Sequence, residues 1–408
     1  MKRNLLYLIS VLFILTMGTG CKEKDMGTPA ASTVANFSFV VTNQGYAPLE
    51  AEFTNSSLNA TGYFWDFGNG QTSTAVSPKV TYETPGLYRV TLTCTPVNTV
   101  YYNQEVKTLI VNVKDPLAGL TQVFYFTTRG TPGNGHMVIL EDDPAVPVIQ
   151  DFEPADMSRP YGIAVDTVHK KVYITDYTNQ AIYRYDADGK NGQKILDAAV
   201  PGQEIVGDAE AIFVLGEKVY WGRPGGIYRA DLDGANPELF IAMNGGAEPD
   251  FPIDMQYDPA SNKIYFVNDK TDYLGGFWSV NFDGTGFTEI PFDAPGTSDI
   301  DGTAMELDLR TGKAYLVIYP GDGTVSPDGG VYVCNLDGTA LTKIGETGTK
   351  ATWGIAIDEK RNKLFWGVKN SNMNPDGKII RSNLDGTAQE DWITGVSPHA
   401  MTVTWIKL

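Results

Sequence analysis

The sequence predicts an all-β protein with two folded domains, and two observations carry this prediction. In the longer, C-terminal part of the 408-residue chain, a unit of four short segments rich in β-branched and aromatic residues recurs. Its spacing is roughly 40–50 residues, which is typical of small β units that stack side by side. In the part before it, segments that alternate apolar and polar residues follow one another without such a repeat.

The clearest copy of the repeated unit reads as four strands: Gly162–Asp166, Lys171–Asp176, Ala181–Asp186 and Gln193–Leu196. Its third strand and the following turn recur as IYRADLDG, FWSVNFDG, VYVCNLDG and IIRSNLDG, and its second strand recurs as KVYW, KIYF, KAYL and KLFW. The turn aspartates occur in all five copies, which indicates a structural role for Asp188, Asp233, Asp283, Asp337 and Asp385.

A sixth unit is divided between the two ends of this region. Gln122–Thr127, His136–Glu141 and Val146–Asp151 supply three strands, and His399–Thr404 supplies the first strand that they lack. Pairing of the C-terminal strand with the others would close a ring and leave no long free sheet edge. The sequence therefore predicts a six-bladed β-propeller over residues 117–408, closed by its C-terminal strand.

The repeated units resemble the YWTD repeats of low-density-lipoprotein-receptor-type propellers, and GIAVD, KVYITD and NLDG are the motifs that carry the resemblance. The tetrad reads YITD in the first complete unit and departs further from the pattern in the other four, so its aspartate survives only at Asp176. The resemblance implies the fold. It says little about function, because the chemistry of such a scaffold lies in its loops.

Residues 33–114 are predicted to form a second β domain. Trp65 and Phe67, and then Tyr88, Val90 and Leu92, occupy every second position, as one buried face of a sheet requires. The segments AEFTNSS, YFWDFGNG and TYETPGLYRVTLT closely resemble a polycystic-kidney-disease-type (PKD) domain, which is an immunoglobulin-like sandwich. We therefore expect Trp65 in the sandwich core, although a tryptophan can also serve as a ligand platform.

Residues 1–20 read as a lipoprotein signal peptide. Lys2 and Arg3 precede the largely apolar run Leu5–Met17, and small residues lead to Cys21. This resembles a bacterial lipoprotein signal, in which the cysteine carries the lipid. The alternatives are a cleaved signal with an unmodified cysteine and an uncleaved anchor.

Residues 21–32 are expected to be a tether. Its charged start, Lys22–Asp25, resembles the export signal of Bacteroidetes-type lipoproteins, and the alternative is a plain solvated linker. We expect an outer-membrane lipoprotein that faces the cell exterior, with the PKD domain as a spacer.

Composition narrows the possible partners. The chain has 49 acidic and 31 basic residues, a formal net charge of −18, and no basic stripe, so nucleic acid is not an expected partner. Three cysteines are too few for a disulfide framework. Neither a nucleophile elbow, nor zinc-ligand spacing, nor a phosphate-binding loop occurs in the sequence.

Comparison of the six units at equivalent positions predicts the functional site. Large apolar residues recur in the first strands and are expected to pack the blades together: Ile163, Ile212, Met255, Met305, Ile355 and Met401. The next position should face the ring axis: Ala164, Phe213, Gln256, Glu306, Ala356 and Thr402. The position two residues before the apolar one varies most, and there six loops should converge on one mouth of the channel. The predicted ligand-binding residues at this mouth are Tyr161, Glu210, Asp254, Asp301, Trp353 and His399, with Glu306 deeper.

Two functions remain open at this stage. Aromatic rings beside acidic and amide groups suit sugars, although the same residues could simply fill loop cores. The first function is non-enzymatic capture of an extracellular polysaccharide or protein, in one version beside a TonB-dependent importer. The second is a calcium-dependent hydrolase or lyase that resembles the gluconolactonase-like propellers, because acidic groups on the axis could hold Ca²⁺. No catalytic residue can be named for it, and no other cofactor is expected.

Overall fold

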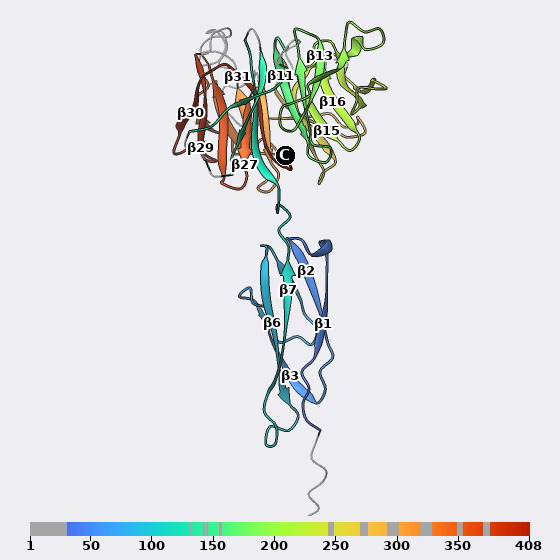
Figure 1. Cartoon of the computed structure of the whole chain (residues 1–408), viewed down its shortest axis with the longest axis vertical. Helices are drawn as coiled ribbons and strands as arrows, with labels where there is room; N and C mark the ends of the chain where they lie inside the picture. Colours follow the sequence, from blue (N-terminus) through green and yellow to red (C-terminus); the bar gives the residue numbers. More distant parts are fainter. Residues whose placement is uncertain are drawn as a thin grey trace, which may run out of the picture. The chain divides into compact units, whose positions relative to one another are not determined.

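The structure, a computed structural model, describes residues 31–130, 133–141, 143, 146–154, 157–243, 249–269, 276–291, 302–318, 329–348, 354–369 and 376–408. The chain divides into two compact units, one ending at Ala118 and the other running from Gly119 to Leu408 (Figure 1). The predicted signal peptide and Cys21 lie outside the described residues. Within those ranges, no helix is both long and apolar enough to cross a membrane.

The first unit is a sandwich of two antiparallel sheets. One sheet has the strand order β1 (Phe37–Val41), β2 (Leu49–Asn55), β5 (Lys79–Tyr82). The other has the order β4 (Thr72–Ser73), β3 (Ala60–Asp66), β6 (Gly86–Pro96), β7 (Glu105–Val113). A single-turn 3-10 helix, η1 (Asn43–Gly45), joins β1 to β2.

The core of this sandwich lies between the sheets and is centred on Trp65. The indole is fully buried, packs against Phe37 with ring centroids 5.0 Å apart, and donates from Nε1 to the carbonyl of Ala75 at 2.9 Å. Val90 and Leu92 of β6 are also fully buried. The predicted alternation and the predicted core position of Trp65 are both confirmed.

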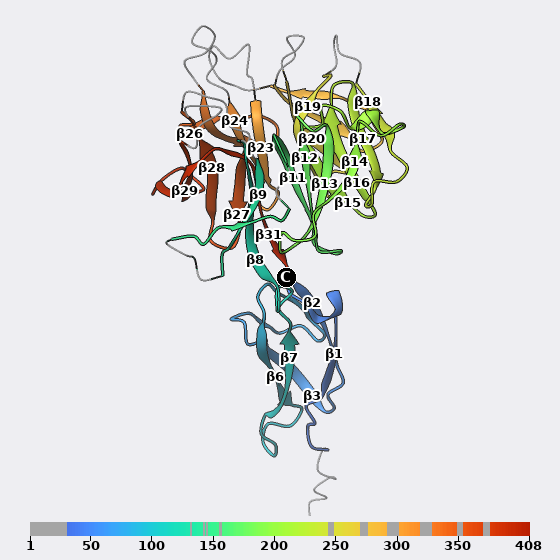
Figure 2. The same ribbon diagram turned by 45° about the horizontal axis from the view of Figure 1, so that its top comes forward.

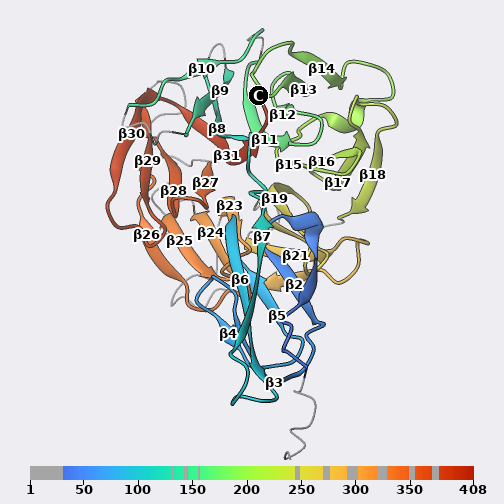
Figure 3. The same ribbon diagram turned by 60° about the horizontal axis from the view of Figure 1, so that its bottom comes forward.

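The second unit contains, among the residues described, six four-stranded antiparallel sheets (Figures 2 and 3). The first three, each given from its inner to its outer strand, are β31 (Pro398–Ile406), β8 (Thr121–Thr128), β9 (Asn134–Ile139), β10 (Gln150–Asp151); β11 (Pro160–Asp166), β12 (Lys171–Asp176), β13 (Ala181–Asp186), β14 (Gln193–Asp197); and β15 (Ile212–Leu215), β16 (Lys218–Arg223), β17 (Gly226–Asp231), β18 (Glu238–Ala242). The short helix η2 (Glu204–Val206) precedes β15.

The other three sheets follow in chain order. They are β19 (Pro252–Asp258), β20 (Lys263–Asn268), β21 (Gly276–Asn281), β22 (Thr288–Ile290); β23 (Gly302–Asp308), β24 (Lys313–Ile318), β25 (Gly330–Asn335), β26 (Thr342–Gly345); and β27 (Ile355–Asp358), β28 (Lys363–Val368), β29 (Gly377–Asn383), β30 (Glu390–Val396).

The inner strands of the six sheets surround a common axis (Figure 3). They contact one another in the cyclic order β31, β11, β15, β19, β23, β27 and back to β31. The C-terminal strand β31 pairs with β8, so the predicted division of the sixth unit between the two ends is confirmed. The predicted outer strand Val146–Asp151 was too long, since only Gln150–Asp151 pairs with β9. Pro147 lies in the remainder and has no N–H to give to a sheet.

The recurring Asp-Gly turns have the structural role that the sequence predicts. In each copy the aspartate carboxylate accepts the N–H of the residue two positions later: Asp188, Asp233, Asp283, Asp337 and Asp385. The following glycine adopts a positive φ, and a Cβ at Gly234 would lie 2.1 Å from the carbonyl oxygen of Ile195, on the outer strand of the preceding sheet. The turn therefore needs glycine both for its backbone angle and for the close approach of two sheets.

The predicted packing layer between the sheets is also confirmed. All six large apolar residues of the first strands are at most 9% exposed. Ile212 shares a cluster with Tyr173 and Ile182 of the preceding sheet. Trp221 and Trp366, on second strands, are fully buried.

Asp176, the surviving aspartate of the YWTD tetrad, ties the end of β12 to the segment before β11. Its carboxylate accepts the backbone N–H groups of Ser158 at 2.7 Å, Arg159 at 3.0 Å, and Thr178 and Asn179 at 3.1 Å each. The side chain is 1% exposed. A single buried carboxylate thus fixes the backbone that carries Arg159.

We expect Asp176→Ala to lower the free energy of unfolding of the second unit by about 3 kcal/mol, because it leaves four partly buried backbone N–H groups without their acceptor. Urea unfolding of the full chain would measure this. Asp188→Ala is the matched control, since its exposed carboxylate accepts one N–H at 3.2 Å and should cost under about 1 kcal/mol. Equal losses in the two variants would contradict the role of Asp176.

Candidate functional site

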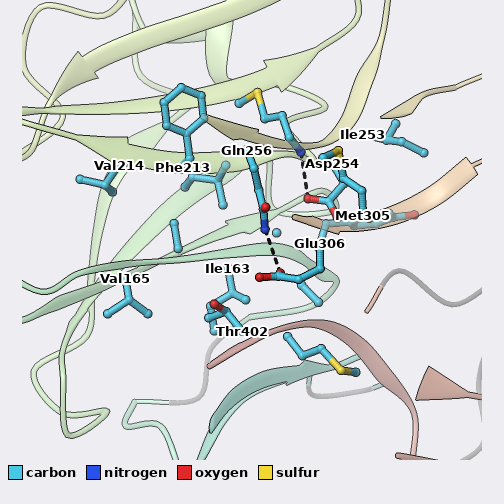
Figure 4. Close-up of a pocket in the computed structure, with 17 residues that line it drawn as sticks. Ile163, Val165, Phe213, Val214, Ile253, Asp254, Gln256, Met305, Glu306 and Thr402 are labelled. Carbon is cyan, nitrogen blue, oxygen red and sulfur yellow. Dashed lines mark hydrogen bonds between the residues drawn. The ribbon is translucent and has the colours of Figure 1, made fainter. Parts of the chain in front are cut away.

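A cavity of about 200 Å³ lies on the axis of the second unit, between inner strands of five of the six sheets (Figure 4). Residues predicted to face the axis line it: Ala164, Phe213, Gln256, Glu306 and Thr402. Pockets for drug-sized ligands usually measure roughly 300–1,000 Å³. This cavity therefore suits one small group, such as a single sugar unit, better than an extended chain.

Polar side chains of β19 and β23 form one wall of the cavity (Figure 4). The amide of Gln256 donates to the carboxyl of Glu306 at 2.8 Å and accepts the N–H of Leu307 at 2.9 Å. Asp254 accepts the N–H of Met305 at 2.8 Å. Because β23 is the innermost strand of its sheet, these N–H groups face the axis, where no strand continues the ladder. Side chains of β19 take the place of that missing strand.

Burial raises the pKa of both carboxyl groups in this wall. The pKa of Glu306 rises to about 8, although the hydrogen bond from Gln256 opposes the change. The pKa of Asp254 rises to about 7, against the effect of two backbone N–H donors. At neutral pH, Glu306 is therefore mostly protonated and Asp254 is divided between its two states. The wall offers hydrogen-bond donors as well as acceptors, which suits a ligand rich in hydroxyl groups.

Tyr161 connects the cavity to a layer of buried polar groups at the end where the inner strands begin. Its ring lines the cavity, and it packs edge-on against the ring of His399 with centroids 4.2 Å apart. The guanidinium of Arg159 lies 4.9 Å from the centre of the Tyr161 ring and donates to its hydroxyl. Arg159 also lies 4.8 Å from the ring centre of Tyr177. The guanidinium of Arg159 thus makes cation–π contacts with both tyrosine rings.

Two more basic residues, Arg129 and Lys369, belong to this layer. Each follows the second strand of its sheet, and the N–H of Arg129 donates to the carbonyl of Ser397, just before β31, at 2.9 Å. The side chain of Lys369 is fully buried. Burial, with repulsion from Arg129 and Arg159, lowers the pKa of Lys369 to about 7. We call Arg129, Arg159 and Lys369 the basic layer.

The same environment sets the protonation of two neighbouring groups. Burial, followed by repulsion from the basic layer, holds the pKa of His399 well below its usual range, so the imidazole is neutral. Burial raises the pKa of Glu210 to about 8, and Asp269 adds to the rise, while Arg159 and Arg129 oppose it. Glu210 is therefore a weak counter-charge for the cations near it at neutral pH.

The structure describes four of the six ligand-binding residues predicted for the mouth. Tyr161, Glu210 and His399 come together in the layer around the strand starts, and Asp254 lies in the cavity wall below it. Asp301 and Trp353 lie outside the described residues. Tyr161 is 4% exposed, Glu210 7% and His399 0%, so these three fill the layer rather than standing open on a rim. Their part in binding stays a prediction.

The basic layer was missed by reasoning from the sequence, although a signal for it exists. Arg129 and Lys369 occupy the same position of their units, three residues after the large apolar residues Phe126 and Trp366. Those two residues pair with Met401 and Ile355 of the first strands. An alignment of second strands, in addition to first strands, would have placed both cations at the end of the ring where Tyr161 lies.

The acidic groups predicted to face the axis are the candidates for a calcium site. Within the described ranges, no group of three or more His, Cys, Asp or Glu side chains is placed so that it could hold a metal ion.

The N-terminal unit matches a known domain family. Residues 28–111 match the family model of the PKD domain. The pre-pro-metalloprotease PrtV of Vibrio cholerae serotype O1 is 52% identical over 42 residues, which are 10% of this chain and 5% of that protein. The chain therefore spans only a small part of that relative.

The second unit is similar to solved propeller structures. A chain of the nidogen/laminin complex matches with a TM-score of 0.53 and 17% identity, over 69% of this chain and 98% of that one. A gluconolactonase from Xanthomonas campestris matches with a TM-score of 0.44 and 13% identity, over 60% of this chain and 79% of that one, which is too slight to bear on activity. The chain thus carries a PKD domain in residues 28–111, followed by a unit with a propeller-like fold.

Proposed function

We propose that this protein is a surface lipoprotein that captures an extracellular polysaccharide without cleaving it. In this proposal the ring is a six-bladed propeller closed by the pairing of β31 with β8, and the PKD domain is a spacer between the ring and a lipid-anchored Cys21. The observation that carries the proposal is the axial cavity, which has a polar wall on one side and apolar side chains on the other.

The two sides of the cavity match the two chemistries of a sugar ring. Asp254, Gln256 and Glu306 supply donors and acceptors for hydroxyl groups. Phe213 supplies an aromatic ring, which is held in place by stacking on Tyr220 with centroids 4.7 Å apart and planes 2° from parallel. C–H faces of a sugar stack on such a ring while its hydroxyls bond to the polar wall.

The placement of the carboxyl groups favours binding over cleavage. A glycoside hydrolase positions two carboxyl groups on opposite sides of the scissile bond. Here Asp254 and Glu306 stand in the same wall, and each is held by hydrogen bonds that join β19 to β23. Their arrangement supports recognition of hydroxyl groups.

We expect Phe213→Ala to weaken binding of the captured glycan by at least about tenfold, since a buried aromatic anchor typically contributes about 2 kcal/mol. A glycan-array screen of the full chain would first identify the ligand, and calorimetry would measure the affinity. The matched control is Phe240→Ala, because Phe240 also packs on Tyr220, at 5.2 Å, without lining the cavity. Unchanged affinity in Phe213→Ala, or an equal loss in both variants, would place the site elsewhere. A ligand found only among proteins would replace the glycan proposal.

We expect Cys21→Ala to abolish lipid labelling and membrane association, because the thiol is the proposed attachment point. Cys94→Ala is the control, since Cys94 is a free cysteine buried in the sandwich core. Fractionation of cells that express each variant would measure the difference. Cleavage of the wild-type protein by protease added to intact cells would support the outward orientation, and full protection would contradict it.

The calcium-dependent hydrolase or lyase remains the second candidate, because a Glu306 that is protonated at neutral pH is in the state that a general acid needs. A site holding Ca²⁺ at 100 times its Kd would stabilise the protein by about 2.7 kcal/mol. On the binding proposal, EGTA changes neither the melting temperature nor glycan affinity. A lower melting temperature in EGTA, together with calcium-dependent release of product, would favour the enzyme.

A further inference from the structure

The basic layer gathers three basic residues in a chain whose formal net charge is −18. Other cations of the second unit have polar partners: Arg381 pairs with Glu390 at 2.6 Å and Arg361 with Asp358 at 2.8 Å, while Lys363 donates to the side-chain oxygen of Asn383 at 2.9 Å. Among the described residues, no carboxylate lies within ion-pair distance of Arg129 or Arg159. The Nε of Arg159 is buried and has no hydrogen-bond acceptor in the described part of the chain.

The two arginines and Lys369 act on one another electrostatically. Arg159 lowers the pKa of Arg129, and both lower that of Lys369, although burial is the larger cause in each case. Bringing like charges together out of water costs free energy unless an anion joins them. Glu210 is the carboxyl group that acts on Arg129, and its own raised pKa leaves it mostly protonated at neutral pH. Among the described residues, Arg129 and Arg159 therefore keep an excess of positive charge.

The layer is next to the cavity proposed for the sugar. Tyr161 forms part of the cavity wall, and the guanidinium of Arg159 donates to the hydroxyl of the same residue. Tyr161 alone would thus separate an anionic substituent of a sugar in the cavity from the guanidinium of Arg159. Arginine is suited to it, because its planar fork binds carboxylate and sulfate oxygens through charge-assisted hydrogen bonds.

We propose that the basic layer binds the anionic group of an acidic sugar, a carboxylate or a sulfate, and so selects acidic over neutral polysaccharides. This inference rests on the proposed function for the identity of the macromolecule, while the anion site itself can be tested without any polysaccharide.

The test uses the full chain and small probes at constant ionic strength. Thermal unfolding is measured with sodium glucuronate, with glucose 6-sulfate, and with glucose as the neutral counterpart. We expect at least one anionic sugar to raise the melting temperature more than glucose, and the larger rise identifies the preferred group. Arg129→Gln should weaken that binding by at least about tenfold, because it removes a charge-assisted hydrogen bond. Arg229→Gln, which alters a cation paired with Glu238, should have no effect.

The pH dependence gives a second readout. The groups that face the layer are Tyr161, Tyr177, His399 and Glu210, and Asp208 and Asp269 act on Glu210 in turn. As the pH rises from 6 to 9, Lys369 loses its proton around pH 7 and Glu210 becomes charged around pH 8. The first change removes a positive charge and the second adds a negative one. Asp254 and Glu306 of the cavity wall also become charged between pH 6 and pH 9, so the anionic probe should bind more tightly at pH 6 than at pH 9. His399 is neutral throughout this range and does not contribute.

The outcomes separate this inference from the proposed function. Equal melting temperatures with glucuronate, glucose sulfate and glucose would overturn the anion site, and so would full binding by Arg129→Gln. A response to the anionic probes in a protein that retains no polysaccharide would support the anion site and contradict the proposed function. Capture of neutral and acidic polysaccharides with equal affinity would leave the proposed function standing and overturn the selectivity.

Discussion

Each four-stranded sheet of the second unit has an inner edge on the axis, and the peptide groups of that edge have no further strand to pair with. Buried N–H groups without acceptors cost too much to be left in a stable fold. On β23 the solution comes from its neighbour, because Asp254 and Gln256 of β19 accept the N–H groups of Met305 and Leu307. The inner strands thus require polar side chains on the axis for stability, whether or not a ligand binds there.

The same requirement makes the axis suitable for recognition. Asp254, which accepts an N–H of the edge, and Glu306, which accepts a hydrogen bond from Gln256, are desolvated on the axis, and desolvation raises the pKa of both carboxyl groups toward or above neutrality. Protonated carboxyl groups can donate as well as accept, so a wall built for stability also presents hydrogen bonds to hydroxyl groups. Structure and recognition share these side chains, and a substitution that removes one of them will affect both. Phe213 is the better probe because it lines the cavity without bonding to the edge.

The sequence predicted the second unit well because its repeats are in register: strand positions, turn aspartates and the apolar packing layer all follow from one alignment. It failed where one copy departs from the pattern, as at Pro147, which shortens the outer strand of the divided unit. The first-strand alignment found Tyr161, Glu210 and His399 but could not show that they are buried. It also missed Arg129 and Lys369, because they lie after second strands and come together only when sheets far apart in the sequence become neighbours around the ring.

A chain with a net charge of −18 is an unexpected host for an anion site, and screening by salt resolves the conflict. At physiological ionic strength, fields between exposed charges fade over about 8 Å, so acidic residues on the outer surface scarcely reach the axis. In the basic layer Lys369 is fully buried and the two arginines are half-buried, so their charges are screened less than those on the outer surface. An acidic polymer would therefore be repelled weakly at a distance and held strongly on contact. The acidic outer surface therefore lowers the rate at which acidic polymers associate non-specifically with the protein. It leaves unchanged the affinity of the basic layer for an anionic group that is bound in it.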